Sequence, residues 1–583
     1  MAIAIGIDLG TCFSEVACLE NGRPKVIPNA EGQSCTPSVV AFAQAGQLLV
    51  GQAARRQATA NPLRTVSSIK RRMGSWHTVA IDERRYTPQE ISGFILRKLK
   101  ADAEDHLGER IEQAVITVPA YFNDRQRQAT REAGILAGLS VLGLLNEPTA
   151  TAIAYGLNRE DAHTILVWDL GAGTFDVSLL ALGEGIFEVR AVSGDNQLGG
   201  DDFTRRVADH MALHYQRTYD TPLPDRPDVW ERLGEEAENA KIRLCYSPVV
   251  RVSLPFLVSG PQGPRHLETE LTRGQFNALT ADLVERLVIP TRQALKDADL
   301  SPQQIDRVIL AGGGCLMPAV RELARKLFGK EPYRHIDPFT VVAQGAAIYA
   351  GMLLGLVDRA VLLDVLPLSL GVETQGGLMA RVIARNTPLP ASAGQVFATA
   401  TDYQTTMDIH ILQGERELAV DNISLGQFQL DGIPSARRGV AKVEVSFGAD
   451  VDGIVHVSAK DLLAENEVKV RVASTKLLDP GEIERLKEEA QRNEEQDKER
   501  RARVLAGIEA DNTIAAAEMA LEEMGSPGSD PSVGQIVRGV GEVKTALASG
   551  MVEEIRLQCR ELRRLLAALH QDGRIPSESM ARG

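Results

Sequence analysis

The sequence predicts a multidomain protein with a large α/β part, then an antiparallel β-sandwich, then helices. Three observations predict this order. Residues 5–14 and 165–180 each place an Asp-Leu-Gly turn between two apolar strands. From residue 378 on, apolar residues recur with the period of two that is typical of strands. After residue 480 the chain becomes rich in Glu, Lys and Arg, as in solvated helices. With 583 residues, the chain is too long for a single core.

The composition excludes several classes of protein. Hydrophobic residues make up 44% and charged residues 24%, which is ordinary for a globular protein. The 64 basic and 78 acidic residues give a net charge of −14, which argues against a nucleic-acid partner. The sequence has neither an apolar run of about 18 residues nor a basic signal-peptide region, so we expect no membrane span. Six scattered cysteines without a CxxC pair indicate reduced thiols in a cytoplasmic protein.

The two hairpins carry the clearest chemistry. An apolar strand ends at Asp169, the small residues 171–174 form a turn, and Asp176 begins the returning strand. Such a turn lets backbone N–H groups approach an anion closely, and flanking carboxylates suit Mg²⁺ held against phosphates. Asp8-Leu9-Gly10 repeats the pattern near the N-terminus. One such turn is as often a plain hairpin, but two copies predict a duplicated phosphate clamp.

Other candidate residues stand at the ends of predicted strands. Glu147 follows the strand 141–145, where α/β sheets bind ligands. The strand 307–311 runs into three glycines, and Pro318 then opens a helix. This order predicts a binding site for an anion or a nucleotide, and the alternative is a turn that binds no ligand. Lys70 lies in a cluster of basic residues that is, taken alone, more often a solvated face.

The α/β part contains a regular series of expected elements. The strands expected from apolar runs are 114–119, 141–145 and 307–311, with others near 249–257. The helices expected from spacing and capping residues are 51–75, 88–107, 124–139, 149–155, 201–218, 229–245, 272–297 and 341–355.

The second half of the chain divides into a linker, strands and helices. Residues 360–364 are apolar although they lie between domains, so we expect them to dock onto the α/β part in one state, with a sandwich strand as the alternative. Period-two strands then alternate with turns such as Asp431-Gly432 and Asp452-Gly453. Beyond the loop 526–531, apolar faces at helical spacing favour a helical bundle over a coiled coil.

Longer stretches resemble the seventy-kilodalton heat-shock chaperone family of the DnaK type. They include IGIDLGT, AVITVPAYFNDRQRQAT, LLNEPTATAIAYG, DLGAGTFDVS, GDNQLGGDDF and VLLDVLPLSLGVET. The resemblance is close over residues 3–475, and the first half is similar to the HscC-like branch. It implies an actin-like, two-lobed ATPase domain over residues 1–357 and a linker over 358–366. It further implies a β-sandwich peptide-binding domain over 367–476 and an α-helical lid over 477–583.

The resemblance also implies a function. We expect an ATP-dependent chaperone of protein folding and the stress response that binds extended apolar segments of unfolded proteins. Hydrolysis would be coupled to peptide capture and release. ATP or ADP, Mg²⁺ and K⁺ are the implied ligands, and a J-domain co-chaperone and a nucleotide exchange factor the implied partners. An actin-fold sugar kinase would explain the clamp but not the apolar linker and sandwich. A scaffold that binds nucleotide without turnover is disfavoured by intact Lys70, Glu147 and Thr174.

The resemblance assigns roles to individual residues. The implied catalytic residues are Lys70, Glu147, Asp169 and Thr174. The implied Mg²⁺ residues are Asp8 and Asp169. The implied nucleotide-binding residues are Gly10, Thr11, Cys12, Gly171, Gly173, Gly199, Gly200, Glu238, Lys241, Gly312, Gly313 and Gly314. The implied peptide-binding residues, which would otherwise be sandwich core, are Val372, Thr374, Phe397, Ala400, Met407 and Ile409. The implied allosteric residues are Pro119, Arg127, Leu362, Leu363 and Asp364.

The sequence departs from the family pattern at several positions. Cys12 replaces a threonine, and in an anion-binding turn it could be a redox-sensitive thiolate, with an inert buried thiol as the alternative. Leu316 and Phe339 replace polar or charged residues at the adenine rim, which predicts weaker ATP binding or poorer discrimination against GTP. Gly143 replaces an arginine that helps to bind J-domain partners, so that partnership is expected to be weaker.

Overall fold

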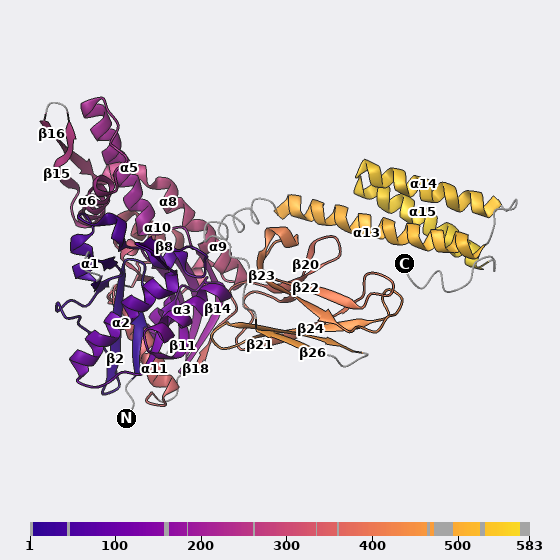
Figure 1. Ribbon diagram of the computed structural model, residues 1–583, viewed down its shortest axis with the longest axis horizontal. Coiled ribbons are helices and arrows are strands. Elements are labelled where there is room, and N and C mark those ends of the chain that lie inside the picture. Colours follow the sequence, from indigo (N-terminus) through magenta and orange to yellow (C-terminus); the bar gives the residue numbers. More distant parts are fainter. Residues whose placement is uncertain are drawn as a thin grey trace. The chain divides into compact units, whose positions relative to one another are not determined.

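The computed structural model describes residues 4–43, 47–156, 162–183, 185–260, 263–333, 335–357, 361–462, 467–471, 494–524 and 531–571 (Figure 1). The chain divides into two compact units. The first consists of Met1–Leu370, Val382–Asp408 and Ser424–Glu484, and the second of Gly371–Arg381, Ile409–Ile423 and Arg485–Gly583. The predictions for residues 472–493, 526–530 and 572–583 lie outside the described residues.

Two sheets of the first unit share a four-strand arrangement, in which β10-β1-β2-β3 corresponds to β17-β12-β13-β14. In the first the strand order is β11-β10-β1-β2-β3, and in the second it is β17-β12-β13-β14-β18. In each, a central strand pairs in parallel with one neighbour and antiparallel with the other, so the β1–β2 and β12–β13 hairpins occupy equivalent places. The strands are β1 (Ala4–Asp8), β2 (Phe13–Glu20), β3 (Arg23–Ile27), β10 (Gln113–Val118), β11 (Ser140–Asn146), β12 (His163–Leu170), β13 (Phe175–Gly183), β14 (Ile186–Asp195), β17 (Arg307–Ala311) and β18 (Val361–Leu363).

Smaller strands complete the first unit. Strand β4 (Thr36–Pro37) pairs with β2, and β5 (Val40–Phe42) lies between β6 (Leu48–Val50) and β7 (Thr65–Val66). Two antiparallel hairpins are formed by β8 (Val79–Ile81) with β9 (Arg84–Tyr86), and by β15 (Val249–Gly260) with β16 (Gly263–Thr272).

Helices begin and end where local chemistry allows. Thr87 caps α2 (Pro88–Leu107) by accepting a hydrogen bond from the Glu90 backbone amide, and the Glu90 side chain accepts one from the Thr87 amide in return. Gly108 ends the helix with a φ of 68°. Further helices of the first unit surround the sheets: α3 (Asp124–Leu136), α4 (Glu147–Gly156), α5 (Gly200–Tyr219), α6 (Pro227–Tyr246), α10 (Pro318–Phe328) and α11 (Val341–Leu353).

Two predicted helices were wrong. Residues 51–75 contain only α1 (Gln52–Gln57), because Pro62 lacks an amide donor and Ser68 takes a left-handed conformation with φ 51°. Short 3₁₀ turns, η1 (Pro62–Arg64) and η2 (Ile69–Arg72), follow instead. The predicted helix 272–297 divides into α7 (Arg273–Leu279), α8 (Ala281–Arg286) and α9 (Val288–Asp297), because Thr280 leaves the helical region and Pro290 cannot donate.

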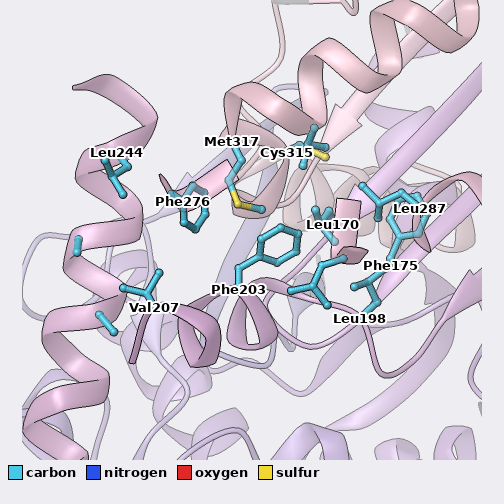
Figure 2. Packing of buried hydrophobic residues seen from close by; sticks show 14 of the residues in the cluster. Leu170, Phe175, Leu198, Phe203, Val207, Leu244, Phe276, Leu287, Cys315 and Met317 are labelled. Carbon is cyan, nitrogen blue, oxygen red and sulfur yellow. The ribbon is translucent and has the colours of Figure 1, made fainter. Parts of the chain in front are cut away.

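The core of the first unit fills the space beside each sheet. Figure 2 shows the cluster beside the second sheet, where Phe175 and Leu170 of the hairpin meet Phe203 of α5 and Met317. A second cluster packs β1, β2 and β10 against α2 and α3. A third includes α4 and α11, and Leu362 of β18 packs against it.

Two four-stranded sheets follow β18 in the chain. One has the order β20-β19-β22-β23 and the other β21-β24-β25-β26. In β24, Val443, Val445 and Phe447 are buried and alternate with less buried residues, as the period of two predicts. The strands are β19 (Leu370–Thr374), β20 (Leu378–Ile383), β21 (Ala391–Ala398), β22 (Thr406–Gln413), β23 (Ile423–Asp431), β24 (Lys442–Ala449), β25 (Val455–Asp461) and β26 (Glu467–Arg471).

The last three helices form a bundle of their own. Helices α13 (Glu494–Glu523), α14 (Pro531–Ser549) and α15 (Val552–Gln571) share one apolar cluster. Ile536 and Val543 of α14 and Cys559 and Leu562 of α15 are buried in it. A helical bundle was predicted for this part of the chain. Within the described residues, no helix combines the length and the apolar character needed to cross a membrane.

Candidate active site

A cavity of about 200 Å³ lies between the turns of the two equivalent hairpins. It brings together most of the residues singled out in the sequence, although they come from distant segments. Its lining includes Asp8, Gly10, Thr11, Cys12, Lys70, Glu147, Asp169, Gly171, Thr174, Gly200, Glu238, Lys241, Gly312, Gly313 and Gly314. The cavity has a polar end, with carboxylates and a lysine, and an apolar end beside α6 and residues 338–342.

Gly173 and Gly199 do not line the cavity but shape its wall. A Cβ atom on Gly199 would lie 2.4 Å from the Ala172 carbonyl oxygen, and one on Gly173 would lie 2.8 Å from Thr11 Oγ1. Glycine therefore allows the second turn to pack against the start of α5. The Gly200 amide donates to the Gly171 carbonyl at 2.9 Å, which fixes the turn on the helix.

Lys70 and Glu147 form a buried ion pair at the polar end. The Lys70 ammonium donates to Glu147 Oε1, and the two residues are 6% and 7% exposed. Burial opposes the charge on Lys70, but the Glu147 and Asp8 carboxylates outweigh it and raise its pKa. Burial raises the pKa of Glu147 to about 8 against the opposing effect of Lys70. Lys70 is thus distinct from its exposed neighbour Arg72, although the sequence shows one basic cluster.

Asp8 and Asp169 face the same end. Burial raises the pKa of both carboxyls, and for Asp169 the nearby carboxylates of Glu147 and Asp176 raise it further. Thr117 Oγ1 donates to Asp8 Oδ1 at 2.8 Å and fixes its orientation. Among the described residues, no group of three or more His, Cys, Asp or Glu side chains is placed to hold a metal ion. Carboxylates such as these two are ligands that Mg²⁺ accepts when waters and phosphate oxygens complete its coordination shell.

The sequence analysis missed Glu15 at this site. It lines the cavity, is 3% exposed and lies directly opposite Asp8 in the β1–β2 pair. Burial, followed by the Asp8 carboxylate, raises the pKa of Glu15 well above its usual value. Counting residues across the turn from Asp8 could have placed Glu15 on the same face, since paired residues of a hairpin share a face.

Arg71 was also missed, because a run of basic residues does not show which member turns inward. Its guanidinium donates to the Gly173 carbonyl at 2.9 Å and to Asp202 Oδ2 at 2.7 Å. Since Arg71 belongs to η2 and Gly173 to the second hairpin turn, this side chain connects the two halves of the cavity wall.

Of the two alternatives for Cys12, the structure favours the inert thiol over the reactive thiolate. Its Sγ donates to Asp201 Oδ1 at 3.3 Å, and burial together with the Asp201 and Glu238 carboxylates raises the thiol pKa well above its usual value. The backbone nest was expected to favour an anion, but the nearby carboxylates reverse the local field. The inert thiol, which the sequence left open, is the better description.

Residues beside α6 and β17 form the wall next to the apolar end. Lys241 Nζ lies 2.7 Å from Glu238 Oε2 and donates to the Gly200 carbonyl at 3.0 Å. Gly312 has a φ of 76°, and a Cβ atom there would lie 2.4 Å from the Leu170 carbonyl oxygen. Glycine is thus required for the loop after β17 to approach the end of β12.

The linker adds a strand to the second sheet. Residues Val361–Leu363 form β18 and pair in parallel with β14. Three buried side chains were expected, but Val361 and Leu363 are 52% and 41% exposed, and only Leu362 packs against a core cluster. Neighbouring side chains of a strand point to opposite faces, so Leu362 can pack against the core only while Val361 and Leu363 point away from it.

Other predicted allosteric residues lie beside the linker. Pro119 is buried at the end of β10. Arg127 donates to Asn146 Oδ1 at 2.6 Å and to the Asp452 carbonyl at 3.3 Å. Asp364 accepts a hydrogen bond of 2.9 Å from Asn146 Nδ2, and burial raises its pKa against the opposing charge of Arg127. The basic partner that the sequence could not identify for Asp364 is thus Arg127, acting through Asn146.

The predicted peptide-binding residues divide between the two units. In the second unit, Val372 and Ile409 are buried and Thr374 is half-buried. In the first unit, Phe397 and Met407 are half-buried. Ala400, also in the first unit, is exposed. Their assignment to a peptide site stays a prediction.

The first unit places two equivalent glycine turns around one cavity, where they face a buried lysine and several acids. Two four-stranded sheets and a helical bundle follow in the chain. A family model described as Hsp70 protein matches residues 4–82 and 75–573. The chain belongs to the Hsp70 family and is a chaperone of the Hsp70 type. Members of this family are ATPases that bind ATP or ADP with Mg²⁺, and they act on unfolded clients together with co-chaperones.

Proposed function

We propose that this chain hydrolyses ATP and couples hydrolysis to the capture and release of extended apolar segments of unfolded proteins. The observation that carries the proposal is the buried Lys70–Glu147 pair, which faces both glycine turns across one cavity. A scaffold without turnover would have no need to bury a lysine and several carboxyls, since each costs free energy unless it is paired or liganded. The cavity is therefore better explained as a catalytic site, whose charged side chains stabilise the charge that develops during ATP hydrolysis.

Each residue at the polar end has a role in the proposed reaction. Asp8 and Asp169 would hold Mg²⁺, which supplies positive charge to the phosphate oxygens when bound. Lys70 neutralises charge on the transferred phosphoryl group. Glu147 and Thr174 orient the attacking water and would also hold K⁺, which adds positive charge when bound. Backbone amides of the two turns stabilise the remaining phosphate oxygens, because glycines allow a close approach.

The second half of the proposal concerns peptide. Val372, Thr374, Phe397, Met407 and Ile409 come from strands, and an extended peptide is held by strand backbones and apolar pockets. We propose that these residues, with Ala400, bind clients. A J-domain co-chaperone and a nucleotide exchange factor are the proposed partners. Binding of the J-domain co-chaperone should be weak, because Gly143 replaces an arginine that helps to bind it. The scattered, unpaired cysteines support a cytoplasmic location.

Turnover by the Lys70→Ala variant tests the catalytic half of the proposal. We expect a loss of about 10²- to 10³-fold in the steady-state rate, which is typical when one group that stabilises transition-state charge is removed. Binding of ADP should persist. Arg72→Ala is a matched control, since Arg72 is the exposed neighbour. Turnover in Lys70→Ala equal to that of the control would exclude Lys70 from catalysis.

A further inference from the structure

The apolar end of the cavity differs in chemistry from the polar end. It is formed by Ile242 and Tyr246 of α6 on one wall and by Leu316 and Phe339 on the other. Phe339 is positioned by Gly313, because a Cβ atom on that glycine would lie 3.1 Å from the Phe339 ring. Ile242, Tyr246 and Phe339 are 45%, 74% and 41% exposed, so this end is open to solvent.

Polar groups near this end are already engaged. Cys245 Sγ donates to the Lys241 carbonyl, and Lys241 itself pairs with Glu238. In the loop after β17, the Cys315 amide donates to the Gly312 carbonyl and the Cys315 carbonyl accepts from Arg321. The polar side-chain atom that remains among the described lining residues of this end is the exposed hydroxyl of Tyr246.

We infer that this end holds a nucleobase by apolar contact alone and does not distinguish a 6-amino from a 6-oxo purine. The inference rests on the proposed function, because the phosphates must lie at the polar end for the base to reach Leu316 and Phe339. Sites that hydrogen-bond a polar group reject analogues that lack it by large factors, whereas apolar pockets discriminate weakly. Stacking on aromatic and aliphatic side chains is tolerant of base identity, since every base has a π-face. The ligand class is therefore purine nucleoside triphosphates in general.

Binding of a nucleotide series to the full chain tests the inference. We expect the dissociation constants of ATP, GTP and ITP, measured with Mg²⁺ by calorimetry, to agree within about tenfold. Tripolyphosphate, which lacks a base, should bind at least about tenfold more weakly than ATP. ATP binding 100-fold tighter than GTP would overturn the inference and leave the proposed ATPase intact. Equal binding of tripolyphosphate would show that the apolar end holds no base. Failure of every nucleotide to bind would refute the proposed function and the inference with it.

A variant separates apolar contact from hydrogen-bond readout. Phe339→Ala should weaken ATP and GTP by the same factor, about fivefold or more, and leave their ratio unchanged. Phe256→Ala is the matched control, because Phe256 is an exposed aromatic residue of β15 that does not line the cavity. A change in the ATP-to-GTP ratio of more than tenfold in Phe339→Ala would contradict the inference, since the wall would then read the base edge.

Discussion

Asn146 donates a hydrogen bond of 2.9 Å to Asp364 and so connects the end of β11 to the linker. The same amide accepts a hydrogen bond of 2.6 Å from Arg127. The next residue, Glu147, pairs with Lys70 in the cavity. One peptide bond therefore separates a contact of the linker from a contact of the proposed catalytic site. A change at either place has a short path to the other through a rigid junction of strand and helix.

Removal of the Asp364 carboxylate should uncouple the linker from the cavity. In Asp364→Ala, Asn146 loses its acceptor and the Val365 amide loses its 2.8 Å partner. We expect basal ATP hydrolysis to stay within about twofold, while stimulation by peptide falls by most of its value. Asp364→Asn is the matched control, because one oxygen acceptor remains and part of the stimulation should be kept. Full stimulation in Asp364→Ala would contradict this path.

Binding of Mg²⁺ with nucleotide should release protons. Burial raises the pKa of Asp8 and Asp169 above the ordinary 3.8, so these carboxyls hold protons to a higher pH than free aspartate. A bound cation requires the deprotonated forms, and affinity should therefore increase with pH. Calorimetry of Mg²⁺-ADP binding at constant pH, in two buffers of different ionisation enthalpy, measures the release. Asp8→Asn should reduce the number of protons released. If the native chain released no protons, the raised pKa of Asp8 and Asp169 would be refuted.

The same shifts fix the sign of the pH effect on stability. An acid whose pKa is raised in the folded chain favours folding below that pKa and loses this contribution as pH rises through it. The nucleotide-free protein should therefore become less stable as pH rises above the ordinary values of its buried acids.

Cys12 should be unreactive. Its raised pKa leaves little thiolate at neutral pH, and the thiolate is the form that peroxide and alkylating agents attack. We expect Cys12→Ser and the native chain to lose ATP hydrolysis at the same rate in mild peroxide. Mass spectrometry after brief iodoacetamide treatment should show Cys12 unmodified. Protection by Cys12→Ser would indicate that the carboxylates of Asp201 and Glu238 do not control this thiol.

Local signals in the sequence predicted the elements that local chemistry determines. Pro88 and the helical spacing of apolar residues such as Ile91 and Leu99 predicted α2, and its observed bounds agree with 88–107. The predicted helix 51–75 failed because Pro62 and the left-handed Ser68 outweigh a favourable composition. The break at Thr280 has no comparable local signal, and it is accompanied by tertiary packing, since α9 lies against β13 and β14.

In the candidate site, too, some residues could be predicted from local sequence and others only from tertiary structure. The two Asp-Leu-Gly turns could be predicted from the sequence, because the pattern occurs twice and glycine allows the backbone to approach closely. Glu15 and Arg71 could not, since each reaches the cavity only through tertiary structure: one opposite Asp8 in a strand pair, the other across to Asp202. The field around Cys12 likewise depends on carboxylates that lie far away in the sequence.

Leu362 and Leu363 offer the sharpest test of the linker. Leu362 packs against a core cluster of the first unit, whereas Leu363 is 41% exposed on the other face of β18. Replacing a packed leucine with aspartate removes about 1.5–3 kcal/mol of apolar burial and adds a charge that must stay hydrated, so β18 should leave β14. The same change at Leu363 places the charge in solvent.

We therefore expect Leu362→Asp to abolish peptide stimulation of ATP hydrolysis and the acceleration of peptide release by ATP. Leu363→Asp, its matched control, should retain at least half of each effect. Both variants should keep basal turnover, because neither residue lines the cavity. Fluorescent peptide release after ATP addition, measured by stopped flow, distinguishes the two. Equal loss in both variants would mean that the linker acts through its backbone pairing with β14 rather than through the Leu362 side chain. Retention of ATP-accelerated release in Leu362→Asp would show that β18 is not the coupling element.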